Sequence, residues 1–274
     1  MPELEDDFGF TPFANLEFYR EINAKLLDLA GISRQRRIID LGCGSGGVTE
    51  LILDRIQAAK DTCVYEIDHS TASIRAAVAH LGDRGDAAVK FVQAEVQNLS
   101  QTIKEQVDTI VYCNSIHYVN EKAELIRQIR DGLEPGGIFA FNTSFYDGGH
   151  PPESEAFYRR WMLRSLRILR KDHGIMPNKD ARVESRVHLT PMDYEKLLYD
   201  QGLKINKIKV DSAGVPIEGW LEISAFRDWI EGVMPGVPLA TGRAALQKAV
   251  RQIFEEQNIE SVPRNWLQIV ASRI

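Results

Sequence analysis

The residues with the clearest chemical meaning are the glycines of the stretch IIDLGCGSGG. Gly42, Gly44 and Gly47 satisfy G-x-G-x-x-G, a pattern in which backbone amides at the start of a helix bind the pyrophosphate of a dinucleotide. Asp40, together with Gly42, Gly44 and Gly46, satisfies D-x-G-x-G-x-G instead. The two patterns predict different ligands, because only the second includes a carboxylate.

Asp40 favours the second pattern. It lies two residues before the first glycine, where its negative charge would repel a pyrophosphate. S-adenosylmethionine (SAM) has no phosphate and carries an ammonium, a carboxylate and a sulfonium at its methionine end, so a nearby carboxylate attracts it while glycines allow a close backbone approach. The loop therefore favours SAM. An NAD-dependent oxidoreductase that uses the other pattern stays as the alternative.

Acidic residues also close two of the predicted strands. Asp68 ends VYEID, about 20 residues after the loop, where one carboxylate can accept two hydrogen bonds from the vicinal diol of a ribose. A capping role before a helix that starts at Ser70 and Thr71 is the other interpretation of Asp68. Glu95, in QAEV, ends the next predicted strand.

On these residues the chain resembles the class I SAM-dependent methyltransferases, with landmarks in the family's order: the glycine loop, VYEID, QAEV, VDTIVYCNSIHYV and LEPGG. The resemblance implies that the loop holds the methionine end of the cofactor, that Asp68 binds the ribose hydroxyls and that Glu95 lies near the adenine amino group. It also implies that His69 replaces an apolar residue against the adenine. The cofactor-binding residues expected on this basis are Asp40, Gly42, Cys43, Gly44, Gly46, Asp68, His69, Glu95, Val96 and Asn114.

One histidine is the candidate catalytic residue. His117 follows the fourth predicted strand, at the carboxyl edge where open α/β sheets bind ligands, and a base there could take a proton from a hydroxyl or amine as the methyl group arrives. Packing under the cofactor is its alternative role. For the acceptor we expect contacts from Tyr19, Tyr146 and Trp161. Tryptophans concentrate in the carboxyl half, which favours a small apolar or aromatic acceptor methylated on oxygen, nitrogen or carbon.

Alternating strands and helices must position these residues. Five runs rich in β-branched and aromatic residues predict strands over 36–40, 62–68, 89–95, 108–114 and 137–142. Helical patterns mostly separate them, which is typical of right-handed crossovers and a parallel sheet. Further strands are expected over 203–210 and 266–274, the latter antiparallel as the resemblance implies. The predicted fold class is α/β: a Rossmann-like, doubly wound, seven-stranded sheet, mostly parallel with an antiparallel last strand, plus helical cap insertions.

A single methyltransferase domain is expected over the whole chain, residues 1–274. Its core is expected over about 36–146, 191–210 and 264–274, and its helical cap over about 147–190 and 211–263. An amphipathic helix is predicted over 13–30. Thr190, Pro191 and Asp193 predict a capping box at the start of another helix.

Composition narrows the function classes. The net charge of −6 disfavours a nucleic-acid substrate, and NSIH after the fourth strand differs from the N-P-P-Y type segment of nucleic-acid amino methyltransferases, which stay as a further alternative. The three cysteines form no C-x-x-C, so no metal site is expected. The sequence contains no run of 18 apolar residues and begins with an acidic stretch, so we expect a cytoplasmic protein without stable membrane insertion. The sequence makes no prediction of oligomeric state.

Overall fold

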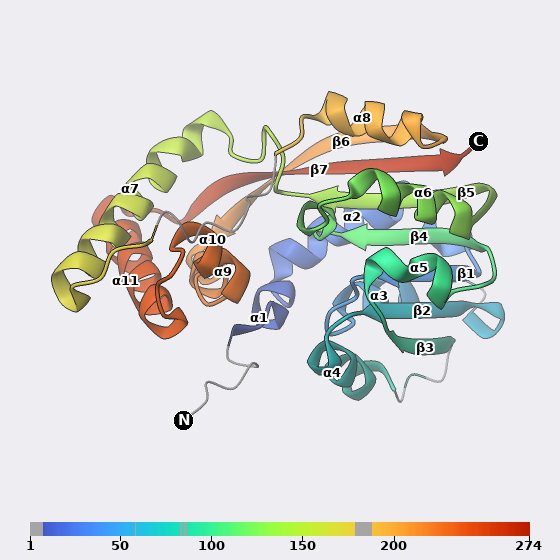
Figure 1. Ribbon diagram of the computed structural model, residues 1–274, viewed down its shortest axis with the longest axis horizontal. Helices are drawn as coiled ribbons and strands as arrows, with labels where there is room; N and C mark the ends of the chain where they lie inside the picture. The colour runs from blue at the N-terminus through green and yellow to red at the C-terminus, as the bar shows by residue number, and fades with distance from the viewer. Residues whose placement is uncertain (1–7, 58, 83, 85–86, 179–187) are drawn as a thin grey trace. The chain divides into compact units, whose positions relative to one another are not determined.

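The computed structural model describes residues 8–57, 59–82, 84, 87–178 and 188–274, and Figure 1 labels its helices and strands. The chain divides into two compact units. We name them the sheet unit, which comprises Tyr19–Gly149, Arg186–Asp211 and Trp266–Ile274, and the helical unit, which comprises Met1–Phe18, His150–Ser185 and Ser212–Asn265. Residues 179–187 of the expected cap lie outside the described residues.

The sheet unit is built on strands in the order β3-β2-β1-β4-β5-β7-β6 (Figure 1). Their bounds are β1 Arg37–Leu41, β2 Cys63–Asp68, β3 Ala88–Gln93, β4 Val107–Cys113, β5 Leu133–Thr143, β6 Leu203–Pro216 and β7 Ser261–Arg273. The first five strands pair in parallel, and β7 runs antiparallel to β5. The predicted Rossmann-like sheet with its antiparallel last strand is confirmed.

Helices cover both faces of this sheet. One face packs against α2 Glu17–Ala30, α3 Gly47–Leu53 and α4 Thr71–Leu81, and the other against α5 Leu99–Thr102, α6 Lys122–Gly132 and α8 Pro191–Asp200. Successive side chains of a strand point to opposite faces, so Ile38 of β1 packs with the first group of helices and Ile39 with the second. Strands buried on both sides explain the nearly continuous apolar runs of the sequence.

The strand order places β1 between β2 and β4, so the order of the strands reverses at this point of the sheet. Open α/β sheets bind ligands outside the carboxyl ends of the strands at such a switch point. The glycine loop follows β1 directly and leads into α3. The fold therefore positions the loop where a ligand is expected.

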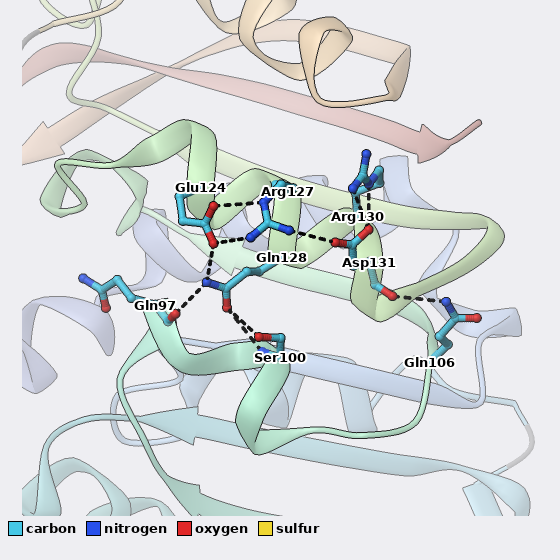
Figure 2. A network of polar contacts seen from close by, with 8 residues as sticks. All are labelled: Gln97, Ser100, Gln106, Glu124, Arg127, Gln128, Arg130 and Asp131. Carbon is cyan, nitrogen blue, oxygen red and sulfur yellow. Dashed lines mark hydrogen bonds and ion pairs between the residues drawn. The ribbon is translucent and has the colours of Figure 1, made fainter.

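A polar network fixes the segment after β3 against α6 (Figure 2). Gln128 of α6 donates a hydrogen bond from Nε2 to the carbonyl oxygen of Gln97 at 2.8 Å. Its Oε1 accepts hydrogen bonds from both the amide and the hydroxyl of Ser100 at 3.3 Å. The turn that carries Glu95 and Val96 is thereby anchored to the neighbouring helix.

The helical unit contains α1 Thr11–Ala14, α7 Pro152–Ile168, α9 Ile217–Ile223, α10 Arg227–Val233 and α11 Leu239–Gln257. Aromatic side chains form its core. Trp161 stacks on Trp229 with ring centroids 5.7 Å apart and contacts Trp220 edge-on. The indole N–H of Trp161 donates to the carbonyl oxygen of Leu246 at 3.1 Å, so this buried polar group is satisfied within the unit.

Both carboxyl-terminal strands are longer than expected. The strand expected over 203–210 continues to Pro216, and the one expected over 266–274 begins at Ser261. In β7 the alternation of buried and less buried residues extends back through Val262 and Arg264. A buried arginine hides this alternation in the sequence, because arginine is usually exposed.

Two helical expectations also change. The helix expected over 13–30 is interrupted, with α2 beginning at Glu17, and the interruption lets Phe13 pack edge-on against Phe18 at 5.6 Å. Within the helical cap expected over 211–263, one helix, α9, ends at Ile223 and the next, α10, begins at Arg227. The hydroxyl of Ser224 between them donates to the carbonyl oxygen of Trp220.

The capping box at the start of α8 is confirmed. The amide of Asp193 donates to the Thr190 hydroxyl at 3.1 Å, and the Thr190 amide donates to the Asp193 carboxylate at 2.8 Å. No helix within the described part of the chain has the length and apolar character needed to cross a membrane.

Candidate functional site

The backbone of the glycine loop distinguishes the two sequence patterns. Gly42, Gly44 and Gly46 adopt positive φ angles of 67°, 57° and 86°, a region in which a side chain is strained. Gly47 is instead the first residue of α3 and has no positive φ, and a Cβ added there would meet no atom within 4 Å. The positions that require glycine are therefore those of the D-x-G-x-G-x-G pattern.

Backbone hydrogen bonds tie this loop to the end of β2. The amides of Gly42 and Cys43 donate to the carbonyl oxygen of Ile67 at 2.7 and 3.1 Å, and the Gly44 amide donates to Oδ2 of Asp68 at 3.0 Å. Burial raises the pKa of the Cys43 thiol well above its ordinary value, so the side chain stays neutral. These hydrogen bonds fix the backbone of the loop from Gly42 to Gly44 against the end of β2.

Asp40 is buried at the end of β1, with 1% of its surface exposed. Its Oδ2 accepts a hydrogen bond of 2.8 Å from the hydroxyl of Thr49 on α3. Burial and the neighbouring Glu66 together raise the pKa of Asp40 to about 8, against a smaller lowering by the Thr49 hydrogen bond. A cationic group brought near Asp40 would favour its charged form.

Asp68 accepts hydrogen bonds from the backbone, as its capping interpretation predicts, and it can still accept hydrogen bonds from a ligand. Besides the bond from Gly44, its Oδ1 accepts a hydrogen bond of 2.8 Å from the amide of Ser70, before α4. His69 is exposed, with Nδ1 3.5 Å from Oδ1 of Asp68. A carboxylate has about four lone-pair positions, so the two oxygens can still accept hydrogen bonds from a diol.

Sequence reasoning missed Glu66. This residue of β2 is fully buried at 0% exposure and lies opposite Asp40 in the strand register. Within the described chain, neither of its carboxylate oxygens has a hydrogen-bond partner. Burial, with a smaller contribution from Asp68, raises the pKa of Glu66 to about 7, against a lowering by Thr49. The available signal was an acidic residue inside an apolar strand, CVYEID.

Glu95 and Val96 lie at the neighbouring strand end. Gln93 of β3 pairs with Asp68 of β2, so Glu95 follows two residues beyond that pair. Glu95 is exposed, and Val96 is half-buried against the apolar core on one face of the sheet. The structure therefore brings both residues to the same edge of the sheet as the glycine loop.

Asn114 anchors the ends of β4 and β5. It has a positive φ of 47°, and its Oδ1 accepts hydrogen bonds from the amide and hydroxyl of Ser144 at 2.9 and 3.1 Å. The backbone amide of Asn114 donates to Oδ1 of Asn142 at 2.9 Å. Asn142 in turn donates to Asn23 of α2 at 2.9 Å, across 119 residues of sequence. Asn23 and Asn142 were not identifiable from sequence because their contact is long-range.

His117 lies in the 3-10 turn Ile116–Tyr118 after β4 and is 3% exposed. Its ring stacks on Phe145, with centroids 4.0 Å apart. Its Nδ1 is 3.4 Å from the hydroxyl oxygen of Thr143, which also accepts a hydrogen bond from the Phe145 amide at 3.0 Å. The imidazole is thereby oriented by the end of β5.

The three residues expected to contact an acceptor are all buried. Tyr19 of α2 and Tyr146 after β5 belong to the sheet unit, as do all the other predicted site residues. Burial raises the pKa of the Tyr146 hydroxyl to about 12 and that of Tyr19 further, so both are neutral. Trp161 belongs to the helical unit, where its contacts are those of a core residue. The described residues include no group of three His, Cys, Asp or Glu side chains suited to a metal ion.

Comparison with known protein families gives the last observation on this site. The sequence model of one family, described as a methyltransferase domain, matches residues 39–139, which include the glycine loop, Asp68, Glu95 and His117. A curated relative, the trans-aconitate 2-methyltransferase of Delftia acidovorans, is 26% identical over 223 residues, or 77% of this chain and 76% of the relative. Residues 39–139 therefore form a class I SAM-dependent methyltransferase domain. It is an enzyme, and its cofactor is SAM.

Two further methyltransferases are similar to this chain, one in sequence and one in structure. The trans-aconitate 2-methyltransferase of Streptomyces avermitilis is 32% identical over 143 residues, or 51% of each chain. The phosphoethanolamine N-methyltransferase 2 of Haemonchus contortus was solved with phosphomonomethylethanolamine and S-adenosylhomocysteine. It has a TM-score of 0.58 and 16% identity, covering 96% of this methyltransferase and 56% of that chain. At this identity the solved structure shows a shared fold.

Proposed function

We propose that this methyltransferase binds SAM on the glycine loop between β1 and α3 and transfers the methyl group to a small organic acceptor. The observation that carries the proposal is the set of left-handed glycines, Gly42, Gly44 and Gly46, between the carboxylates of Asp40 and Asp68. Glycines let a ligand approach the backbone closely, and the carboxylates suit an ammonium on one side and a ribose diol on the other.

Each predicted cofactor residue then has a role. The methionine end lies on the loop near Asp40, and the ribose lies at Asp68. His69, Glu95 and Val96 surround the adenine. The Oδ1 of Asn114 is already engaged by Ser144, so its NH₂ group is the part that faces the cofactor.

SAM supplies a methyl group on a positively charged sulfur. The protein contributes alignment, and near-attack geometry can supply about 7 kcal/mol or more of the barrier reduction. Here the bonds of Asn114 to Ser144 and Asn142 hold the ends of β4 and β5 in one arrangement. A rigid edge of this kind keeps a bound acceptor in line with the methyl group.

We also propose that His117 takes the proton of an acceptor whose nucleophile carries one. Its position after β4 supports this role, as does the contact of Nδ1 with Thr143 that orients the ring. A carboxylate acceptor needs no base, because its oxygen attacks without losing a proton.

The acceptor class is a small carboxylic acid in the first instance. This choice is supported by the relatives that carry the name trans-aconitate 2-methyltransferase, one of which aligns with 77% of this chain. A small apolar or aromatic acceptor is the second candidate, and Tyr19 and Tyr146 in the sheet unit favour it. Neither class is a nucleic acid.

A methyl-transfer assay with isotopically labelled SAM tests this proposal. Trans-aconitate, an aromatic monocarboxylate, a phenol and a short DNA duplex serve as acceptors, and mass spectrometry identifies the product. Base-labile ester product with the carboxylates supports the first class, and base-stable ether product with the phenol supports the second. Labelled DNA, with no label on any small molecule, would contradict the proposal.

A further inference from the structure

Two acidic side chains meet at the base of the glycine loop. Asp40 of β1 and Glu66 of β2 are partners in the strand register, and both are fully buried. A Cβ added to Gly46 would lie 3.0 Å from Oε1 of Glu66, so this carboxyl group lies directly against the loop. Glu66 and Asp68, two residues apart on one strand, point to the same face of the sheet.

The hydroxyl of Thr49 satisfies only one member of the pair. It has one hydrogen, which it donates to Oδ2 of Asp40 at 2.8 Å. Neither oxygen of Glu66 has a hydrogen-bond partner within the described chain. A buried carboxyl group without such a partner favours its protonated form.

The charged surroundings do not neutralise the pair. Asp68 on β2 and the buried thiol of Cys43 in the loop add no positive charge. On α3, Glu50 pairs with Arg20 of α2 at 2.8 Å and with His80 of α4 at 3.3 Å, so these basic groups are engaged elsewhere.

Leu81 of α4 is the other neighbour of the Gly46 position, and it is apolar. Tyr19 of α2 is buried, and its hydroxyl is neutral. Two charged carboxylates in such an environment would repel each other at close range in a poorly solvated site, and a retained proton removes that cost.

We propose that Asp40 and Glu66 hold one proton between them in the cofactor-free enzyme, and that the cationic end of SAM expels this proton to solvent when it binds. The inference rests on the proposed placement of SAM on the glycine loop. Glu66 is then a positioning residue, which acts through Asp40 without touching the cofactor. The pKa values of Glu66 and Asp40, raised to about 7 and about 8, agree with a proton held near neutrality.

Calorimetry of SAM binding in phosphate and in Tris, whose ionisation enthalpies differ, counts the protons released. For the wild-type enzyme at pH 7 we expect release of about half a proton or more per SAM, and a Kd that becomes about three- to tenfold lower from pH 6 to pH 8. Glu66→Gln keeps the size and shape of the side chain but removes the titratable carboxyl group. It should release fewer protons than the wild type, and its Kd should depend less on pH, because Asp40 loses the neighbouring carboxyl group that raises its pKa. Any proton released by the amino group of SAM itself is the same for both proteins, so it cancels in the comparison.

Glu50→Gln is the matched control, because it removes a carboxylate next to Thr49 that is already paired with Arg20 and His80. It should release protons as the wild type does. S-adenosylhomocysteine, which lacks the sulfonium charge, should release fewer protons than SAM. Equal proton release by wild type and Glu66→Gln would overturn the inference.

Two further outcomes separate this inference from the cofactor site itself. SAM that binds the wild type without proton release at any pH from 6 to 8 overturns the shared proton alone, whereas SAM that does not bind overturns both proposals. If Glu66→Gln fails to fold, the wild-type count decides. It should fall toward zero above about pH 9, where the pair has already ionised, and a count that stays constant with pH contradicts the inference.

Discussion

The backbone amide of Gly44 donates a hydrogen bond of 3.0 Å to Oδ2 of Asp68, which joins the glycine loop after β1 to the end of β2. One carboxylate therefore stabilises the loop and is proposed to bind the ribose of SAM. The two functions are coupled, since any change at Asp68 alters both the ligand contact and the position of the amides that approach the ligand.

Asp68→Ala should weaken SAM binding by roughly 1.5–3 kcal/mol, the range for hydrogen bonds to a charged group. Asp68→Asn retains one acceptor oxygen and should lose less. Isothermal calorimetry measures both variants, and circular dichroism checks that the loop change has not unfolded the chain. Wild-type affinity in Asp68→Ala would remove Asp68 from the cofactor site.

Gly46 and Gly47 form a matched pair of adjacent glycines. At Gly46 the φ of 86° and a Cβ only 2.8 Å from Leu81 make alanine strained, so Gly46→Ala should destabilise the fold by about 1–3 kcal/mol and weaken SAM binding. Gly47→Ala, at the first turn of α3 with open space around it, should leave stability unchanged or raise it by up to about 1 kcal/mol. Urea denaturation compares them. The opposite order would restore the G-x-G-x-x-G interpretation.

Features that depend on local sequence can be predicted from the chain, whereas features that depend on long-range contacts cannot. The glycine loop and strands β1 to β5 are readable because apolar runs and left-handed glycines are local properties of the chain. The contact of Asn142 with Asn23 and the burial of Glu66 depend on strand register and on helix docking, which no local pattern contains. Trp161 is predicted to contact the acceptor and also stacks on Trp229. Aromatic residues in a core and in a binding site have the same sequence signature, so the sequence does not distinguish the two roles.

Asp40 and Glu66 also predict how stability depends on pH. Their pKa values rise on folding from 3.8 and 4.5 to about 8 and about 7, so their favourable contribution is complete below about pH 4 and is lost as the pH rises through 7 to 8. Other carboxylates act in the opposite sense, so the useful quantity is the difference between variants. Relative to wild type, Glu66→Gln should be more stable at pH 8 than at pH 5 in thermal unfolding, whereas Glu50→Gln should show no such trend. A flat difference for Glu66→Gln would contradict the raised pKa.

His117→Asn tests the proposed base. With a phenol or amine acceptor, turnover at saturating substrates should fall about 100-fold while SAM affinity stays the same. With a carboxylate acceptor, turnover should change little, because no proton has to leave. The two acceptors thus control for each other in one variant. Equal turnover with both, once saturated, would assign His117 to packing against Phe145.

A crystal structure with bound S-adenosylhomocysteine tests the central claim most directly. The account predicts that the amino-acid end of this ligand lies on the backbone of Gly42 to Gly46, next to Asp40, and that both ribose hydroxyls lie within hydrogen-bond distance of Asp68. A ligand whose ribose is bound by another residue, or whose amino-acid end lies away from the glycine loop, would contradict it.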